Sequence, residues 1–123
     1  MVPDSLLDAL HRRILIADGA MGTMLQAADL GLDDFEGHEG CNEVLNVTRP
    51  DVVRSVHDAY FAAGADLVET NTFGANLGNL GEYGIERRIR ELSEAGARIA
   101  REAAVAAGWA AGSATRIGSM RRS

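Results

Sequence analysis

The sequence is poor in residues that cross-link chains, bind metal ions or span membranes. Its 123 residues include one cysteine, two prolines and 5% aromatic residues. The single thiol, Cys41, cannot form an internal disulfide and cannot supply the several thiolates of a structural zinc site. No apolar run approaches the roughly 18 residues of a membrane span, and the first residues lack the basic region of a signal peptide. We therefore expect a cytoplasmic protein without a membrane partner.

Positive charge is also scarce. Twelve Lys and Arg residues stand against 18 Asp and Glu residues, which gives a net charge of -6. A general affinity for phosphate backbones or anionic lipids needs an excess of Lys and Arg, so nucleic acid is excluded as an expected partner. The 46% hydrophobic and 24% charged residues are typical of one folded domain rather than a disordered chain.

Two short apolar runs indicate strands. Residues 14–18 and residues 66–70 are brief apolar segments that end in polar residues, a pattern typical of strands buried on both faces of a parallel sheet. Residues 114–119 could begin a third strand. Each of the first two runs precedes a helical segment, so the sequence predicts an α/β fold of two βα units with parallel strands.

Three segments have helical periodicity. The second begins at Pro50, which suits the first turn of a helix, with Thr48 as its expected cap and Gly64 as its left-handed end. Between the first two helices, residues 31–46 show no clear periodicity and are predicted to be a long, functional loop. The predicted helices cover residues 4–13, 50–63 and 85–107.

Polar clusters follow both predicted strands, where active sites form in parallel βα architectures. Asp18 and Gly19 offer a carboxylate for a cationic group and a backbone that a ligand can approach closely. Residues 69–74 bring donors and acceptors beside the ring of Phe73. Together the clusters could hold a small zwitterion. Alternatively, the first is ordinary turn chemistry and the second caps the next helix. The glycine spacing matches neither phosphate-binding fingerprint.

The remaining titratable residues have simpler interpretations. His38 and Cys41 are close enough in sequence to share a metal ion, but two ligands do not make a zinc site. Cys41 is therefore interpreted as a free thiol in a polar loop. His11 and His57 fall within predicted helices and are interpreted as surface or packing residues rather than catalysts.

Three motifs in register carry a family resemblance. ADGAMGTMLQ at 17–26, GCNEVLNVTRPDVV at 40–53 and GADLVETNTFGAN at 64–76 resemble the opening of the homocysteine S-methyltransferase family. The Asn-Glu element followed by Glu-Thr-Asn-Thr-Phe is most similar to the branch of cobalamin-dependent methionine synthases. The resemblance covers about residues 6–107. It implies a (β/α)8 barrel of the TIM type that binds homocysteine as a zinc-bound thiolate and receives a methyl group from methylcobalamin.

Matching positions in the family assign roles to five residues. Asp18 and Gly19 correspond to the element that contacts the amino-acid part of homocysteine, and Thr70, Asn71 and Phe73 correspond to the second such element. The family's three zinc cysteines lie on later strands, and Cys41 is not one of them. The resemblance therefore implies substrate contacts without a catalytic or metal-binding residue in this chain.

The length of the chain limits the expected activity. Such a barrel takes about 250 residues, so we expect the opening βα units of a barrel that is truncated before closure. Residues 1–107 are expected to form the N-terminal part of the homocysteine-binding domain, and residues 108–123 a divergent or frame-shifted tail. Zinc, cobalamin and the folate and cobalamin modules would belong to the full-length protein, with none of them bound by this chain alone.

Several functions stay open at this point. The first is the homocysteine-binding part of a methionine synthase, a methyltransferase of methionine biosynthesis that is inactive as an isolated fragment. The alternatives are a non-catalytic amino-acid-binding module, an inert truncation product, or a homocysteine methyltransferase that uses another methyl donor.

Overall fold

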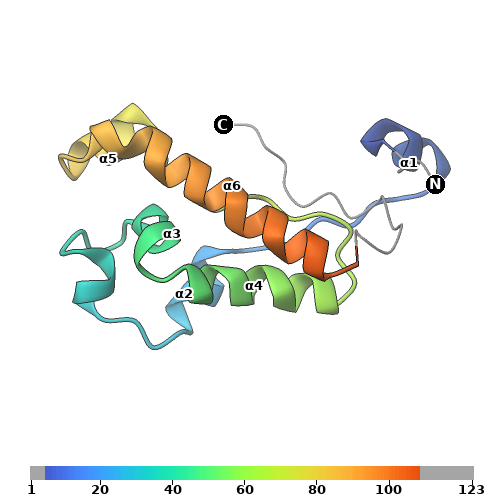
Figure 1. Ribbon diagram of the computed structural model, residues 1–123, viewed down its shortest axis with the longest axis horizontal. Helices are drawn as coiled ribbons and strands as arrows, with labels where there is room; N and C mark the ends of the chain where they lie inside the picture. Colours follow the sequence, from blue (N-terminus) through green and yellow to red (C-terminus); the bar gives the residue numbers. More distant parts are fainter. Residues whose placement is uncertain (1–4, 109–123) are drawn as a thin grey trace.

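The computed structural model describes residues 5–108, and within them the chain forms helices joined by extended segments and turns, without a strand (Figure 1). None of the helices in this range is long and apolar enough to cross a bilayer. The helices are α1 (Leu6–Arg12), α2 (Gly22–Gln26), α3 (Leu45–Thr48), α4 (Pro50–Ala62), α5 (Leu77–Glu82) and α6 (Ile89–Ala106), with 3-10 turns η1 (Leu32–Phe35), η2 (Asn42–Val44) and η3 (Glu86–Arg88).

The predicted fold class, the opening βα units of a (β/α)8 barrel, is wrong for residues 5–108. The two predicted strands, residues 14–18 and 66–70, are joined by one isolated parallel bridge between Ala17 and Leu67. The first segment is also not buried on both faces, because the side chain of Ile14 is 86% exposed. The expected third strand at 114–119 and the expected tail lie outside the described residues, apart from Gly108.

Side-chain carboxylates explain why the bridge does not extend into a ladder. The Asp66 carboxylate accepts a hydrogen bond from the Ile16 amide (2.9 Å), and the Asp18 carboxylate accepts one from the Glu69 amide (3.1 Å). Between them, the Asp18 amide donates to the Leu67 carbonyl (3.1 Å). Each carboxylate thus takes a backbone donor that a longer ladder would pair with a carbonyl group.

Helices α4 and α6 run side by side and form the centre of the fold (Figure 1). Both were predicted, although the first turn expected for α6 is the separate turn η3. Gly64 and Gly108 follow the two helices with positive φ angles of 109° and 121°, as expected for glycine after a helix end. The predicted cap is wrong, because the Thr48 hydroxyl donates to the carbonyl groups of Asp34 and Val44 instead.

The segment predicted to be a long loop, residues 31–46, is more ordered than expected. It contains η1 and η2 and runs into α3, which packs against both α4 and α6. Leu45 of α3 is fully buried in one apolar cluster together with Val53 and Val56 of α4 and Ile99 of α6. This segment therefore forms part of the core and brings its polar residues close to the predicted site.

Helix α1 lies apart from the other helices (Figure 1). It begins after a capping serine, because the Ser5 hydroxyl accepts a hydrogen bond from the Asp8 amide (3.1 Å). The side chains of Leu7 and Leu10 are exposed, so little of its apolar surface is buried. The helix predicted over residues 4–13 is thus present over Leu6–Arg12.

Candidate functional site

The five predicted site residues line one pocket of about 290 Å³. The pocket lies where the segments after the Ala17–Leu67 bridge meet, so the two polar clusters share one site even though they do not follow regular strands. Its lining consists of the predicted residues Asp18, Gly19, Thr70, Asn71 and Phe73 together with Met21, Gly22, Asn42, Glu43 and Glu69. The role of the five residues as ligand contacts stays a prediction.

Asp18 is one of the charged residues that line this pocket. Partial burial raises the pKa of Asp18, and the neighbouring Glu69 carboxylate raises it further, while the hydrogen bond from the Glu69 amide lowers it. The net effect is a raised pKa, which means that the surroundings disfavour the ionised carboxylate. A cationic ligand group beside Asp18 would offset this cost.

Gly19 lies close to an aromatic residue of α4. A methyl group at Gly19 would lie 3.2 Å from the Tyr60 hydroxyl oxygen, which is tighter than an ordinary contact. The same hydroxyl donates a hydrogen bond to the Ala20 carbonyl (3.0 Å) and so fixes the turn after Asp18. A side chain at Gly19 would disturb this bond. Packing against Tyr60 therefore explains why glycine stands at this position, in addition to its predicted contact with a ligand.

The second cluster forms a tightly bonded turn. The hydroxyl groups of Thr70 and Thr72 lie 2.6 Å apart, and the side-chain amide of Asn71 donates to the Asn42 carbonyl (3.0 Å) and to Asn46 Oδ1 (2.9 Å). Both donors of Asn71 are therefore engaged within the protein. In contrast, the ring of Phe73 is 99% exposed.

The alternative that this run caps the next helix is not what the structure shows. The cap of α5 is Asn76, whose Oδ1 accepts a hydrogen bond from the Asn79 amide (2.8 Å). Thr70 and Asn71 are thus left to bond within the turn and to line the pocket.

Two buried polar residues at or beside the pocket were given no individual role from the sequence, although both fall within the motif at 40–53. Glu43 and Asn46 are 6% and 3% exposed, and both bond to the turn that contains Phe73. In the sequence, Asn46 stands between apolar Leu45 and Val47, and Glu43 directly precedes Val44, but neither pattern indicates a bond to a distant turn.

Cys41 is buried, and its thiol bonds to a neighbouring carboxylate. Its thiol donates to Glu43 Oε1 (3.8 Å), and both burial and the Glu43 carboxylate raise the pKa of the Cys41 thiol. The His38 ring lies edge-on against the ring of Tyr83, with 5.9 Å between the centroids. Over residues 5–108, no three His, Cys, Asp or Glu side chains gather in a way that could hold a metal ion.

His57 is buried in α4 and has a packing role, in line with its sequence interpretation. The residue is fully buried, and neither ring nitrogen has a hydrogen-bond partner among the described residues. Burial lowers the pKa of His57 to about 4. The ring is therefore neutral near pH 7, and it does not line the pocket around Asp18.

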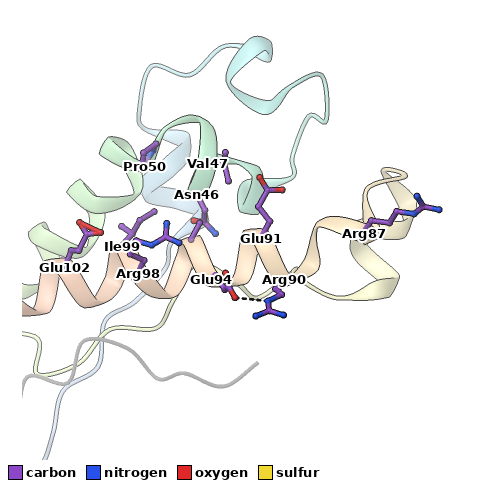
Figure 2. A pocket seen from close by; sticks show the side chains of 11 residues that line it. Asn46, Val47, Pro50, Arg87, Arg90, Glu91, Glu94, Arg98, Ile99 and Glu102 are labelled. Carbon is purple, nitrogen blue, oxygen red and sulfur yellow. Dashed lines mark hydrogen bonds and ion pairs between the residues drawn. The ribbon is translucent and has the colours of Figure 1, made fainter.

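A larger hollow of about 880 Å³ runs along α6, beside α3 and the start of α4 (Figure 2). Arg90 and Glu94 form an ion pair there (2.8 Å), and the other charged side chains along the hollow are also of both signs. Mixed charges along a helix are typical of a solvated face. None of the five predicted site residues lines this hollow, so the smaller pocket is the better candidate.

The family model of homocysteine S-methyltransferase matches residues 15–122. Over 99 residues the chain is 66% identical to the methionine synthase of Mycobacterium tuberculosis (strain ATCC 25618 / H37Rv) and 63% identical to that of Mycobacterium leprae (strain TN). These alignments cover 80% of the chain but 8% of each relative, so the chain spans a small part of their length. The match over most of its residues shows that the chain belongs to the homocysteine S-methyltransferase family.

Proposed function

We propose that this chain forms the amino-acid-binding part of the homocysteine site of a methionine synthase. The observation that carries the proposal is the shared pocket: five residues from two distant segments, selected from the sequence by their match to the family's ligand-contacting motifs, line one cavity of about 290 Å³. This volume lies at the lower end of small-molecule sites, which suits an amino acid.

The pocket has the chemistry to recognise a zwitterion. Its carboxylates, Asp18 and Glu69, favour an ammonium group, and burial around Asp18 strengthens that preference. The Thr70 hydroxyl and the backbone around Gly19 offer polar partners of the kind that a carboxylate needs. The exposed Phe73 ring at this pocket supplies apolar surface for the methylene groups of homocysteine.

Methyl transfer needs groups that this chain does not supply. In the proposed full-length protein, zinc would convert the homocysteine thiol into a thiolate, and methylcobalamin, recharged from the folate module, would donate the methyl group. The described residues do not fit zinc, because the Cys41 thiol is buried against Glu43 and its pKa is raised. We therefore assign substrate binding to this chain and no catalytic step. A cytoplasmic location stays a prediction from the sequence.

The test is a thermodynamic cycle that removes the ammonium group of the ligand and the charge of Asp18, separately and together. Calorimetry measures the Kd of the chain for L-homocysteine and for 4-mercaptobutyrate, which lacks the amino group, with the parent and with Asp18→Asn. The substituted amide still accepts the Glu69 hydrogen bond but carries no charge. A charge-assisted hydrogen bond contributes about 1.5–3 kcal/mol, so Asp18→Asn should weaken homocysteine binding by about tenfold or more and leave 4-mercaptobutyrate binding unchanged.

Asp29→Asn is the matched control, because Asp29 is exposed and does not line the pocket. It should leave both affinities unchanged. Equal binding of the two ligands to the parent, or an equal loss for both in Asp18→Asn, would contradict the assignment of Asp18 to the amino group.

A further inference from the structure

We infer that Glu43 and Asn46 are positioning residues, which hold the two ends of the turn at residues 71–74 so that its groups face the pocket in one fixed arrangement. Neither residue is assigned a role by the family resemblance. The inference deepens the proposed function only where it concerns ligand affinity. The positioning itself rests on the hydrogen bonds of the turn.

Asn46 holds the first end of the turn. Its side-chain amide donates to the Asn71 carbonyl (2.8 Å) and to the Leu92 carbonyl of α6 (3.0 Å), and its Oδ1 accepts from the Asn71 side chain (2.9 Å). One buried side chain therefore joins α3, the turn and α6. Figure 2 shows Asn46 beside α6. Gly96 of α6 makes room for this contact, because a methyl group there would lie 2.8 Å from Asn46 Nδ2.

Glu43 holds the second end. Its Oε2 accepts a hydrogen bond from the Gly74 amide (2.8 Å), and its Oε1 accepts from the Cys41 thiol. A methyl group at Gly74 would lie 2.5 Å from Asn79 Nδ2 and 2.9 Å from both carboxylate oxygens, so glycine is needed for this close approach. The Asn79 side chain also donates a hydrogen bond to the Gly74 carbonyl (2.9 Å).

The hydrogen bonds of Glu43 and Asn46 to the turn are buried, and burial makes them most effective in fixing the position of the turn. A buried carboxylate or amide that loses its partner costs more than an exposed one, so the turn cannot move without a penalty at both ends. Phe73 stands between the two held positions, and its ring is 99% exposed, so packing of the ring does not hold it. The location of Phe73 at the pocket therefore depends on Glu43 and Asn46.

The test separates the position of the carboxylate from its charge. Glu43→Gln removes the charge but keeps an acceptor at the same reach, whereas Glu43→Asp keeps the charge but shortens the side chain by one methylene group. Both are mild changes, and Glu82→Asp on the exposed surface of α5 is the matched control. Hydrogen exchange of the Gly74 amide is measured by NMR, with the α6 amides as an internal reference for global stability.

We expect Glu43→Asp to speed exchange of the Gly74 amide by about ten- to a hundredfold relative to the α6 amides, as for a lost hydrogen bond to a charged group. Glu43→Gln should stay within about threefold of the parent. Asn46→Ala removes both the donor to the carbonyl groups of Asn71 and Leu92 and the acceptor of the Asn71 side chain, so it should likewise speed exchange of the Asn71 side-chain amide. The Kd for homocysteine should rise by about tenfold in Glu43→Asp and Asn46→Ala but not in Glu43→Gln.

Two outcomes would overturn the positioning role. One is unchanged Gly74 exchange in Glu43→Asp, and the other is an equal rise in exchange of the Gly74 and α6 amides in every variant, which would show a general effect on the core. If the parent does not bind homocysteine at all, the proposed function fails, while the exchange data still decide whether Glu43 and Asn46 hold the turn.

Discussion

Acidification should destabilise the fold through one buried histidine. His57 is fully buried without a hydrogen-bond partner, and burial lowers its pKa from 6.5 to about 4. The unfolded chain therefore binds a proton below about pH 6.5, whereas the folded chain does so only below about pH 4. Between these values the unfolded state binds more protons, so the free energy of unfolding falls as the pH falls.

The magnitude follows from the two pKa values. A tenfold difference in proton affinity corresponds to about 1.36 kcal/mol, which gives a limit of about 3.4 kcal/mol below pH 4 and about 2 kcal/mol at pH 5, relative to pH 8. Loss of this size is a large share of the stability of a small domain. The charges of Asp58 and Arg54 act in opposite directions on His57 and are weaker than the effect of burial.

Urea unfolding of the parent and of His57→Leu between pH 4.5 and pH 8 measures this contribution. Leucine is close to histidine in volume and does not titrate, so the variant should lose about 2 kcal/mol less than the parent between pH 8 and pH 5. At pH 8 it should be at least as stable, because two buried nitrogens without partners are removed. His11→Gln, at an exposed position of α1, should behave like the parent. Parallel pH profiles for the parent and His57→Leu would refute the reasoning.

Two further predictions concern packing near the pocket. Gly96→Ala should destabilise the chain by about 1–2 kcal/mol in urea unfolding, because the strain of overpacking against Asn46 exceeds the helix-propensity gain of about 1 kcal/mol. Gly81→Ala in α5, with open space around it, should be neutral or stabilising, and a stabilised Gly96→Ala would contradict the close contact. The buried thiol of Cys41 should react with iodoacetamide at least about a hundredfold more slowly in buffer than in denaturing urea, and equal rates measured by mass spectrometry would show that it is accessible.

The helices could be predicted because their signals are local. Pro50 fixes the φ angle in the first turn of α4. Gly64 follows the end of α4 and adopts the positive φ angle that stops the helix from continuing. In α6 the apolar residues recur every three or four positions, and that stripe contains buried Leu92 and Ile99. Such features act over one or two helical turns, so a short stretch of sequence is enough to predict where each helix lies.

The strands could not be predicted in the same way, because a strand exists only through its partner. Residues 14–18 and 66–70 have the apolar pattern of buried strands, but pairing depends on which backbone groups remain available. Asp66 takes the amide of Ile16, and this bond joins residues that are 50 positions apart in the chain. No local pattern distinguishes an aspartate that interrupts a ladder from one that ends a strand.

The candidate site shows the same division between local and distant information. Asp18 and Thr70 were identified because motifs mark them, and the two segments do meet at one pocket. Glu43 and Asn46 lie within the motif at 40–53, but that motif does not reveal their role, since each acts through a bond to a residue at least 25 positions away. A sequence pattern can thus identify residues that face a ligand, while the residues that hold them in place are recognised only when burial and bonding are known. In this chain Glu43 and Asn46 are both buried, so a substitution at either should alter the pocket without changing any of the five predicted contact residues.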